Sequence, residues 1–364
     1  MKQFFKTIAI VVAIAIFSAN NFSASAEYQF VDAETLTIIN KAQKNEPVWQ
    51  RIDETKYTMP DGVRRLMRYS TGIVVAFTTD SKNIHLRWNT TVKRCVASNM
   101  SPIFHSGLDL YIHDGEAWRY AGSARPKLGK LEHSYPIVRF MEEGKKKCLL
   151  YLPAFTTVTS LQIGVDEGAT IKALPSPFKK KVVFIGSSLT HGASASRPGV
   201  TYVAKVGRAL NVETPNLGMS GSCRLDDFYA DIVCDTKADA FVFDAFSNST
   251  DQQIKERLYN FVKRITKAHP KTPMIFLQTE VRDGGYFDTR ARKRNVDQRN
   301  IAESMMTEIC KEFKHVYFVN PGITAGEDGE GSIDGTHLND LGVQRTVDVL
   351  VPSLQKILKK YGIR

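Results

Sequence analysis

The sequence predicts an α/β protein of two domains, an antiparallel β-sandwich followed by a parallel sheet that is covered by helices. Three observations support this prediction. The chain has 364 residues, which is long for a single hydrophobic core. Up to about residue 173, apolar and polar residues alternate in short runs bounded by turn residues, which is typical of antiparallel strands. Beyond residue 181, short apolar runs alternate with helical patterns, which indicates parallel strands joined by helices.

The first 26 residues have the features of a signal peptide. Lys2 and Lys6 precede an apolar run at 8–17, and Ala-Ser-Ala at 24–26 fits a cleavage site. The run is short for a membrane span. We therefore expect cleavage after Ala26, export to the periplasm or the medium, and no stable membrane insertion; a retained N-terminal anchor is the alternative.

The β-rich domain is expected to cover residues 27–173. Its five clearest strand candidates have the alternating pattern and lie at 72–80, 83–90, 107–115, 148–155 and 158–166. Several short strands at this spacing favour a sandwich of the jelly-roll kind. Two prolines and three lysines then predict a linker at 174–181, LPSPFKKK.

The second domain is expected to cover residues 182–364. Its strand candidates lie at 182–186, 240–246, 274–280 and 315–321, with a weaker one near 211–217, and helical patterns lie near 199–210, 251–268, 294–313 and 340–360. In open parallel sheets, ligands bind beyond the carboxyl ends of the strands. The residues that follow these strands are therefore the candidates for chemistry.

The first strand of this domain ends in VVFIGSSLTHG, at 182–192, which places Ser188 at the edge of the sheet. A serine nucleophile needs a base and a group that orients the base. His337, with Asp334 three residues upstream in DGTH, provides both; the alternative is that this loop is only a turn and a helix cap. His191 is a rival base, but its place on the same turn favours contact with the substrate instead.

Two further strand ends carry hydrogen-bond donors suited to a developing oxyanion. Gly221 lies in a Gly/Ser loop at 216–222, and Asn248 lies just beyond the strand at 240–246. Taken separately, each loop is only a loop. Taken together, four strand ends carry Ser, Gly, Asn and Asp-x-x-His, and this combination predicts acyl transfer.

These residues resemble the SGNH, or GDSL-like, hydrolase family. GSSL at 186–189 is similar to its first block, with Ser187 where an aspartate usually stands, and NLGMSG, FSN and DGTH are similar to the next three. The resemblance implies a flavodoxin-like, three-layer α/β/α fold and ester hydrolysis without a metal or organic cofactor. It also implies a set of site residues: Ser188 as nucleophile, His337 as base, Asp334 as its orienting partner, and an oxyanion hole formed by Ser188, Gly221 and Asn248.

A second resemblance lies in the β-rich half. GLDLY at 107–111 is similar to the Gly-x-Asp-Leu-Tyr signature of an N-terminal domain that accompanies such hydrolases, and Asn99, Met100 and His105 lie in a nearby loop that could face the active site. The arrangement is similar to two-domain carbohydrate esterases, which implies a small-molecule or glycan ester as substrate. Asp109 is therefore a candidate for substrate contact or for simple pairing at the surface.

Tyr286, in DGGYFDTR at 283–290, could form either a platform for a sugar or an apolar wall. Two other functions stay open, the first because of this segment and the second because Ser187 replaces the usual aspartate and the third block matches only loosely. One is a lipid-directed acylhydrolase or thioesterase. The other is a glycan-binding protein without activity, built on a hydrolase scaffold.

Charge and cysteine content exclude other classes. The formal net charge is +11, but the basic runs at 145–147 and 179–181 are short and lack interleaved aromatics, so nucleic acid is not expected as a partner. An odd number of cysteines leaves at least one thiol free, and none has C-x-x-C spacing. Pairing of Cys95 with Cys148 and of Cys223 with Cys234 is one alternative, and buried free thiols are the other.

Overall fold

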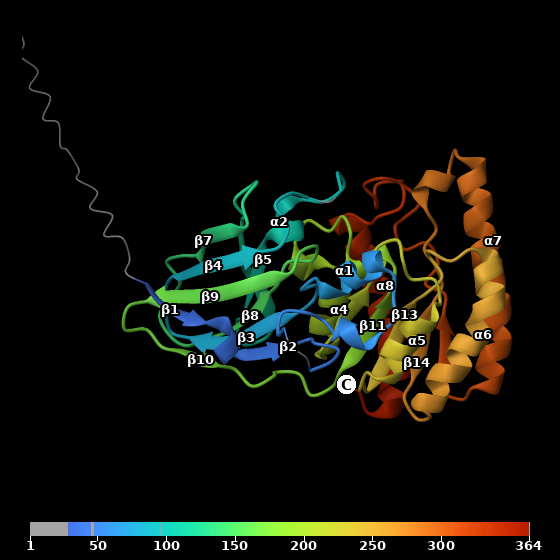
Figure 1. Cartoon of the computed structure of the whole chain (residues 1–364), viewed down its shortest axis with the longest axis horizontal. Coiled ribbons are helices and arrows are strands. Elements are labelled where there is room, and N and C mark those ends of the chain that lie inside the picture. The colour runs from blue at the N-terminus through green and yellow to red at the C-terminus, as the bar shows by residue number, and fades with distance from the viewer. Residues whose placement is uncertain (1–27, 45–46, 96, 364) are drawn as a thin grey trace, which may run out of the picture.

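The computed structural model describes residues 28–44, 47–95 and 97–363. The expected signal peptide and its cleavage site lie outside the described residues. Figure 1 shows a β-rich part, blue to green, beside a part in which helices cover a sheet, yellow to red. None of the helices in the described ranges combines the length and the apolarity needed to cross a membrane.

The β-rich part consists of two antiparallel sheets, as predicted. The first has the order β1 (Tyr28–Asp32), β9 (Val158–Asp166), β4 (Ile84–Thr90), β7 (Glu132–Val138). The second has the order β10 (Ile171–Ala173), β3 (Val74–Thr79), β8 (Lys146–Tyr151), β5 (Leu108–His113), β6 (Trp118–Ala124), with β2 (Thr37–Ile39) beside β3. Alternate side chains of both sheets, among them Phe77, Leu86, Leu110 and Ile163, meet in a shared buried core.

The second half forms a parallel five-stranded sheet between two layers of helices, which confirms the predicted α/β class. Its strands run in the order β12 (Asn216–Gly218), β11 (Val182–Gly186), β13 (Ala240–Asp244), β14 (Met274–Leu277), β15 (Val316–Val319). The helices are α3 (Ser188–His191), α4 (Tyr202–Leu210), α5 (Asp227–Cys234), α6 (Asp251–Ala268), α7 (Thr289–Glu312) and α8 (Asp340–Leu358).

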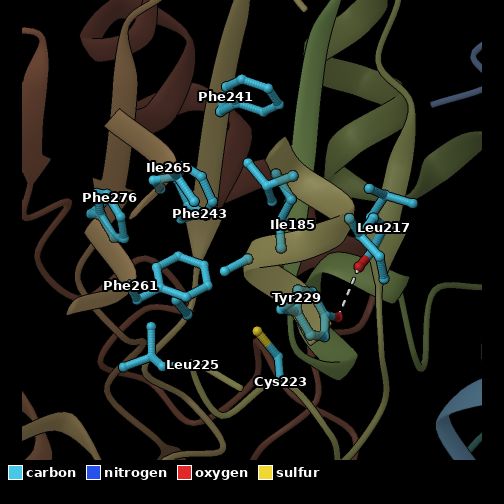
Figure 2. Close-up of a cluster of buried hydrophobic side chains, with 14 of the residues drawn as sticks. Ile185, Leu217, Cys223, Leu225, Tyr229, Phe241, Phe243, Phe261, Ile265 and Phe276 are labelled. Carbon is cyan, nitrogen blue, oxygen red and sulfur yellow. Dashed lines mark hydrogen bonds between the residues drawn. The ribbon is translucent and has the colours of Figure 1, made fainter. Parts of the chain in front are cut away.

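Strand periodicity sends alternate side chains to opposite layers. In β11, Val183 and Ile185 face the core shared with α5, α6 and α7, whereas Val182 and Phe184 face α4 and α8. Figure 2 shows the first of these cores, in which aromatic and aliphatic side chains from strands and helices interlock. The central strands β11, β13 and β14 are buried on both faces, and each therefore has a continuous run of apolar residues.

A segment of the predicted first domain packs on the second. Helix α1 (Asp61–Arg68) places Val63 and Met67, four residues apart on one face, in the core of the α/β sheet together with Ile52. The buried Arg51 donates hydrogen bonds of 2.9 Å to the carbonyls of Asn216 and Gly218, around the end of edge strand β12. The two halves therefore share a core and hydrogen bonds.

All five cysteines are free, so neither pairing forms; the alternative of buried free thiols holds for Cys148 and Cys223, whereas Cys95 is exposed. Cys148 and Cys223 are buried, and burial raises the pKa of the Cys148 thiol to about 12. A thiol in such surroundings stays protonated and unreactive.

Candidate active site

The turn after β11 is built to expose one serine. Ser187 caps α3: its Oγ accepts the Leu189 N–H at 3.1 Å, and this starts the helix at Ser188. Gly186 permits the sharp turn, because a Cβ there would lie 2.3 Å from Thr190 Oγ1. Ser188 consequently lies at the carboxyl edge of the sheet, with 7% of its surface exposed.

A buried carboxylate supports this turn from the neighbouring strand. Asp244, the last residue of β13, accepts hydrogen bonds from the N–H and hydroxyl of Ser187 and, at 2.6 Å, from Ser247 Oγ. Burial raises the pKa of Asp244, and the hydrogen bonds from Ser187 and Ser247 oppose that shift. Asp244 was not among the predicted site residues, although an aspartate at the end of the apolar run AFVFD was a usable signal.

The structure brings together the three residues expected to form the catalytic chain. His337 Nε2 lies 2.8 Å from Ser188 Oγ, and His337 Nδ1 lies 2.8 Å from Asp334 Oδ2. The other oxygen of Asp334 accepts the backbone N–H of His337 at 2.8 Å, which fixes the carboxylate within its own loop.

Electrostatics determine the tautomer of the histidine. Burial alone would raise the pKa of Asp334, but hydrogen bonds from the backbone and ring of His337 and from Asn99 outweigh it and lower the pKa to about 2. An ionised Asp334 holds the proton of His337 on Nδ1. The lone pair of Nε2 is then directed at the Ser188 hydroxyl, as a general base requires.

Asn99 reaches this site from the β-rich half. It lies between β4 and α2 (Pro102–Ser106), and its Nδ2 donates to Asp334 Oδ2 at 2.8 Å. Because His337 Nδ1 carries a proton, the Asn99 amide donates to the carboxylate and not to the ring. Asn99 was expected in a loop that could face the active site, but its role could not be predicted, since nothing in the local sequence links it to Asp334.

Gly221 and Asn248 line the same pocket as Ser188 and His337, a hollow of about 410 Å³. The Nδ2 group of Asn248 is buried and has no hydrogen-bond partner among the described residues. An unpaired buried donor costs about 1–3 kcal/mol, so it is uncommon unless a ligand or water satisfies it. Together with the backbone N–H groups of Ser188 and Gly221, this donor can receive the oxyanion of a tetrahedral intermediate.

His191 does not face this pocket, and the structure corrects the expectation that it contacts the substrate. It is fully buried, its ring stacks on Phe155 at 3.9 Å, and its Nε2 lies 2.8 Å from the carbonyl of Ala154. Burial lowers the pKa of His191 well below its usual value, so the ring is neutral. Its role is to join the two halves, because Phe155 and Ala154 belong to the β-rich half.

The structure also corrects the expectation that Asp109 contacts the substrate or pairs at the surface. Its side chain is completely buried and accepts hydrogen bonds from Arg197 Nη1 at 2.8 Å and from the Gly199 N–H at 2.9 Å. The aspartate of GLDLY therefore binds the loop before α4 and leaves no oxygen exposed to a substrate. Local sequence could not reveal this, because Arg197 lies far along the chain.

Tyr286 lies outside the Ser188 pocket. It is 72% exposed and lines a neighbouring hollow of about 1060 Å³ together with Phe287, Ile333 and Asp334. Substrate contact by Tyr286 stays a prediction. In the part of the chain that the structure describes, no cluster of three or more His, Cys, Asp or Glu side chains is arranged to hold a metal ion.

Comparison with known proteins agrees with this geometry. The GDSL-like lipase/acylhydrolase family model matches residues 179–355, and the model of the GxDLY N-terminus of esterases of the SGNH hydrolase type matches 28–171. A crystal structure named for a GDSL-like lipase from Bacteroides ovatus is 37% identical, with a TM-score of 0.88 over 92% of this chain and 98% of that one. The chain belongs to the GDSL-like lipase/acylhydrolase family. It is thus an ester hydrolase of the SGNH type, as the sequence predicted.

More distant solved structures share the two-part fold. The salicylyl-acyltransferase SsfX3 of a tetracycline biosynthetic pathway is 20% identical, with a TM-score of 0.72 over 93% of this chain and 99% of that one. A family two carbohydrate esterase from Cellvibrio japonicus is 12% identical, with a TM-score of 0.61 over 92% and 98%. No curated protein matches the chain.

Proposed function

We propose that this protein is an exported serine esterase that removes short acyl groups, acetyl above all, from carbohydrates. The observation that carries the proposal is the hydrogen-bonded chain from Ser188 through His337 to Asp334, which opens on a pocket with the unpaired donor of Asn248. Export is expected from the signal-peptide features of residues 1–26.

The geometry supports a two-step reaction. Ser188 Oγ attacks the ester carbonyl carbon while its proton passes to His337 Nε2, and Asp334 stabilises the imidazolium. The oxyanion is held by the N–H groups of Ser188 and Gly221 and by the amide of Asn248. The carbon–oxygen bond to the alcohol then breaks, and His337 gives its proton to the leaving oxygen. Water attacks the acyl-enzyme with His337 again as base, which releases the carboxylic acid and restores Ser188.

The lining of the pocket supports a carbohydrate as the alcohol. Serine, threonine, asparagine and glutamine side chains make up most of the residues around Ser188, and these groups pair with sugar hydroxyls. The two-part fold is shared with an acetyl xylan esterase from Butyrivibrio proteoclasticus, 14% identical with a TM-score of 0.56 over 91% of this chain and 99% of that one. That similarity concerns fold alone, so the acetyl sugar remains our proposal.

A second candidate is an acylhydrolase for longer acyl chains. The hollow beside Asp334 has exposed apolar side chains, with Phe287 at 90% and Ile333 at 55% exposure, which could bind an alkyl chain.

One substrate series separates the two candidates. The protein should release acetate from acetylated oligosaccharides, and its kcat/KM on 4-nitrophenyl esters should fall from acetate to octanoate. A rise with chain length would favour the acylhydrolase. Absence of hydrolysis for every ester, with saturable binding of glycans, would overturn both and favour the non-catalytic binding protein.

N-terminal sequencing of protein recovered outside the cytoplasm tests export, which predicts a mature chain that begins at Glu27.

A further inference from the structure

Three arginines line the pocket that contains Ser188 and His337. Arg224 follows β12, Arg282 follows β14, and Arg294 lies on α7. The residues that line this pocket include no aspartate or glutamate. The lining of the pocket therefore carries positive charge, and the carboxyl groups of Asp334 and Asp244 are hydrogen-bonded to the lining residues His337 and Ser187.

These arginines have no carboxylate partners within the described ranges. Arg224 donates to the carbonyl of Gly221 at 3.2 Å, and Arg282 donates to the carbonyl of Ser247. Arg294 forms no hydrogen bond or ion pair with any of the residues that the structure describes. Other arginines of the chain are paired with acids: Arg197 with Asp109, Arg257 with Asp226 and Arg345 with Asp328.

The arrangement is unfavourable without a ligand. Burial and then the like charge of Arg294 lower the pKa of Arg282, and the buried Asp244 opposes this shift, so the repulsion between the Arg282 and Arg294 guanidinium groups outweighs the attraction of Asp244. An anion between them would remove this repulsion. The planar fork of a guanidinium matches a carboxylate with two parallel hydrogen bonds. The mature chain stays basic, because Lys2 and Lys6 are the only charged residues of the expected signal peptide, and this adds a favourable long-range field for such a ligand.

We infer that the sugar whose ester this protein hydrolyses is acidic, an acylated uronic acid for example, and that Arg224, Arg282 and Arg294 bind its carboxylate. The inference rests on the proposed function, because Ser188 must act on an ester of a sugar for the same pocket to receive both groups. Arg282 lines both this pocket and the hollow that contains Tyr286. A longer acidic glycan could therefore continue past the carboxylate site.

The test compares the acetyl ester of a uronic acid glycoside with that of the matching neutral hexose glycoside. Wild type should favour the acidic ester by about tenfold or more in kcat/KM, as expected for charge-assisted hydrogen bonds on a partly exposed site, and the preference should shrink as salt is added. Arg294→Gln should reduce the acidic-to-neutral ratio about tenfold, and Arg224→Gln should also reduce it. Arg290→Gln removes the same charge from an exposed position of α7 outside the pocket lining, and should leave the ratio and the basal rate unchanged.

Equal kcat/KM for the two esters, or equal losses on both esters in Arg294→Gln, would overturn the inference while esterase activity stood. Failure of the proposed function would appear separately, as no hydrolysis of either ester. For that case, calorimetry of free uronate and of the neutral hexose with the Ser188→Ala protein gives a second measurement. Selective binding of uronate that Arg294→Gln weakens would support the carboxylate site, and equal or absent binding would overturn it. Tighter binding of a sulfated sugar than of the uronate would overturn the assignment of the ligand as a carboxylate.

Discussion

Among the residues around Ser188, Asn248 has a hydrogen-bonding group that the folded protein leaves unused. Its Nδ2 is buried beside the nucleophile and unpaired among the described residues. A donor that gains its partner only when charge develops on a substrate oxygen stabilises the transition state more than the ground state. This is the behaviour expected of an oxyanion-hole residue.

We expect Asn248→Ala to lower kcat by roughly 10²–10³, the usual loss for one oxyanion donor. KM for a small ester should change little, because the donor acts on the developing oxyanion. The thermal midpoint should stay level or rise, since the Asn248 side chain makes no hydrogen bond within the described residues. Steady-state kinetics and a melting curve check both points.

The matched control is Asn300→Ala, which removes an exposed asparagine of α7. It should change neither kcat nor the midpoint. An Asn248→Ala protein with wild-type kcat would remove Asn248 from the oxyanion hole.

At the scale of elements, loops from both halves of the chain meet at the carboxyl edge of the parallel sheet. The loop before α8 supplies Asp334 and His337, the turn into α3 supplies Ser188, and the loop before α2 supplies Asn99. Because Asn99 helps to keep Asp334 ionised, the β-rich half contributes a positioning residue to the chemistry of the other half.

Asn99→Ala should reduce kcat/KM about tenfold, or about 1.4 kcal/mol, close to the value of a hydrogen bond to a charged group. Asn99→Asp should cost more, because a second carboxylate beside Asp334 disfavours its ionised form. The kcat/KM of ester hydrolysis for the two variants, with folding checked by circular dichroism, shows whether Asn99→Asp loses more activity than Asn99→Ala. The exposed Lys93→Ala in the same loop is the control and should match wild type. Wild-type rates for both Asn99 variants would show that Asn99 does not position Asp334.

The sequence predicted the strands and the long helices of the parallel sheet well. It predicted only part of the antiparallel strands, since β1, β2, β6, β7 and β10 were not expected, and it predicted long-range partners poorly. Alternating and continuous apolar runs distinguished antiparallel from parallel strands, because sheets buried on one face or on both leave different patterns. Ser188 and His337 were found because both follow strands of the same sheet. Asp109, His191 and Asn99 each take their role from a residue far along the chain, and nothing in local sequence indicates such a pairing.

At the scale of the whole molecule, buried polar groups join the two halves. His191 stacks on Phe155, Arg197 pairs with Asp109, and Arg51 binds the end of β12. Such groups stabilise the interface only while each buried group is either neutral or paired with an opposite charge.

Two buried histidines, His191 at this interface and His105 in α2, predict loss of stability in weak acid. Burial lowers the pKa of His105 to about 4 and that of His191 well below its usual value. In the unfolded chain both histidines bind protons near pH 6.5, so the free energy of unfolding should fall as the pH drops from 6.5 towards 4. Each histidine contributes up to about 1.4 kcal/mol per pH unit in this window. Asp334, with its pKa of about 2, loses its contribution only below about pH 4, the unfolded value.

Urea unfolding at pH 7, 6 and 5 measures this slope, and His105→Gln should make it shallower. A free energy of unfolding that is constant between pH 7 and 5 would contradict the account of these buried histidines.

Hydrolysis of 4-nitrophenyl acetate by the wild-type protein and by Ser188→Ala, both shown to be folded, is the most direct test of Ser188 as the nucleophile. If Ser188 is the nucleophile that His337 and Asp334 activate, the variant should lose turnover to near the uncatalysed background while the wild type is active. Near-normal hydrolysis by Ser188→Ala would contradict the assignment of the active site.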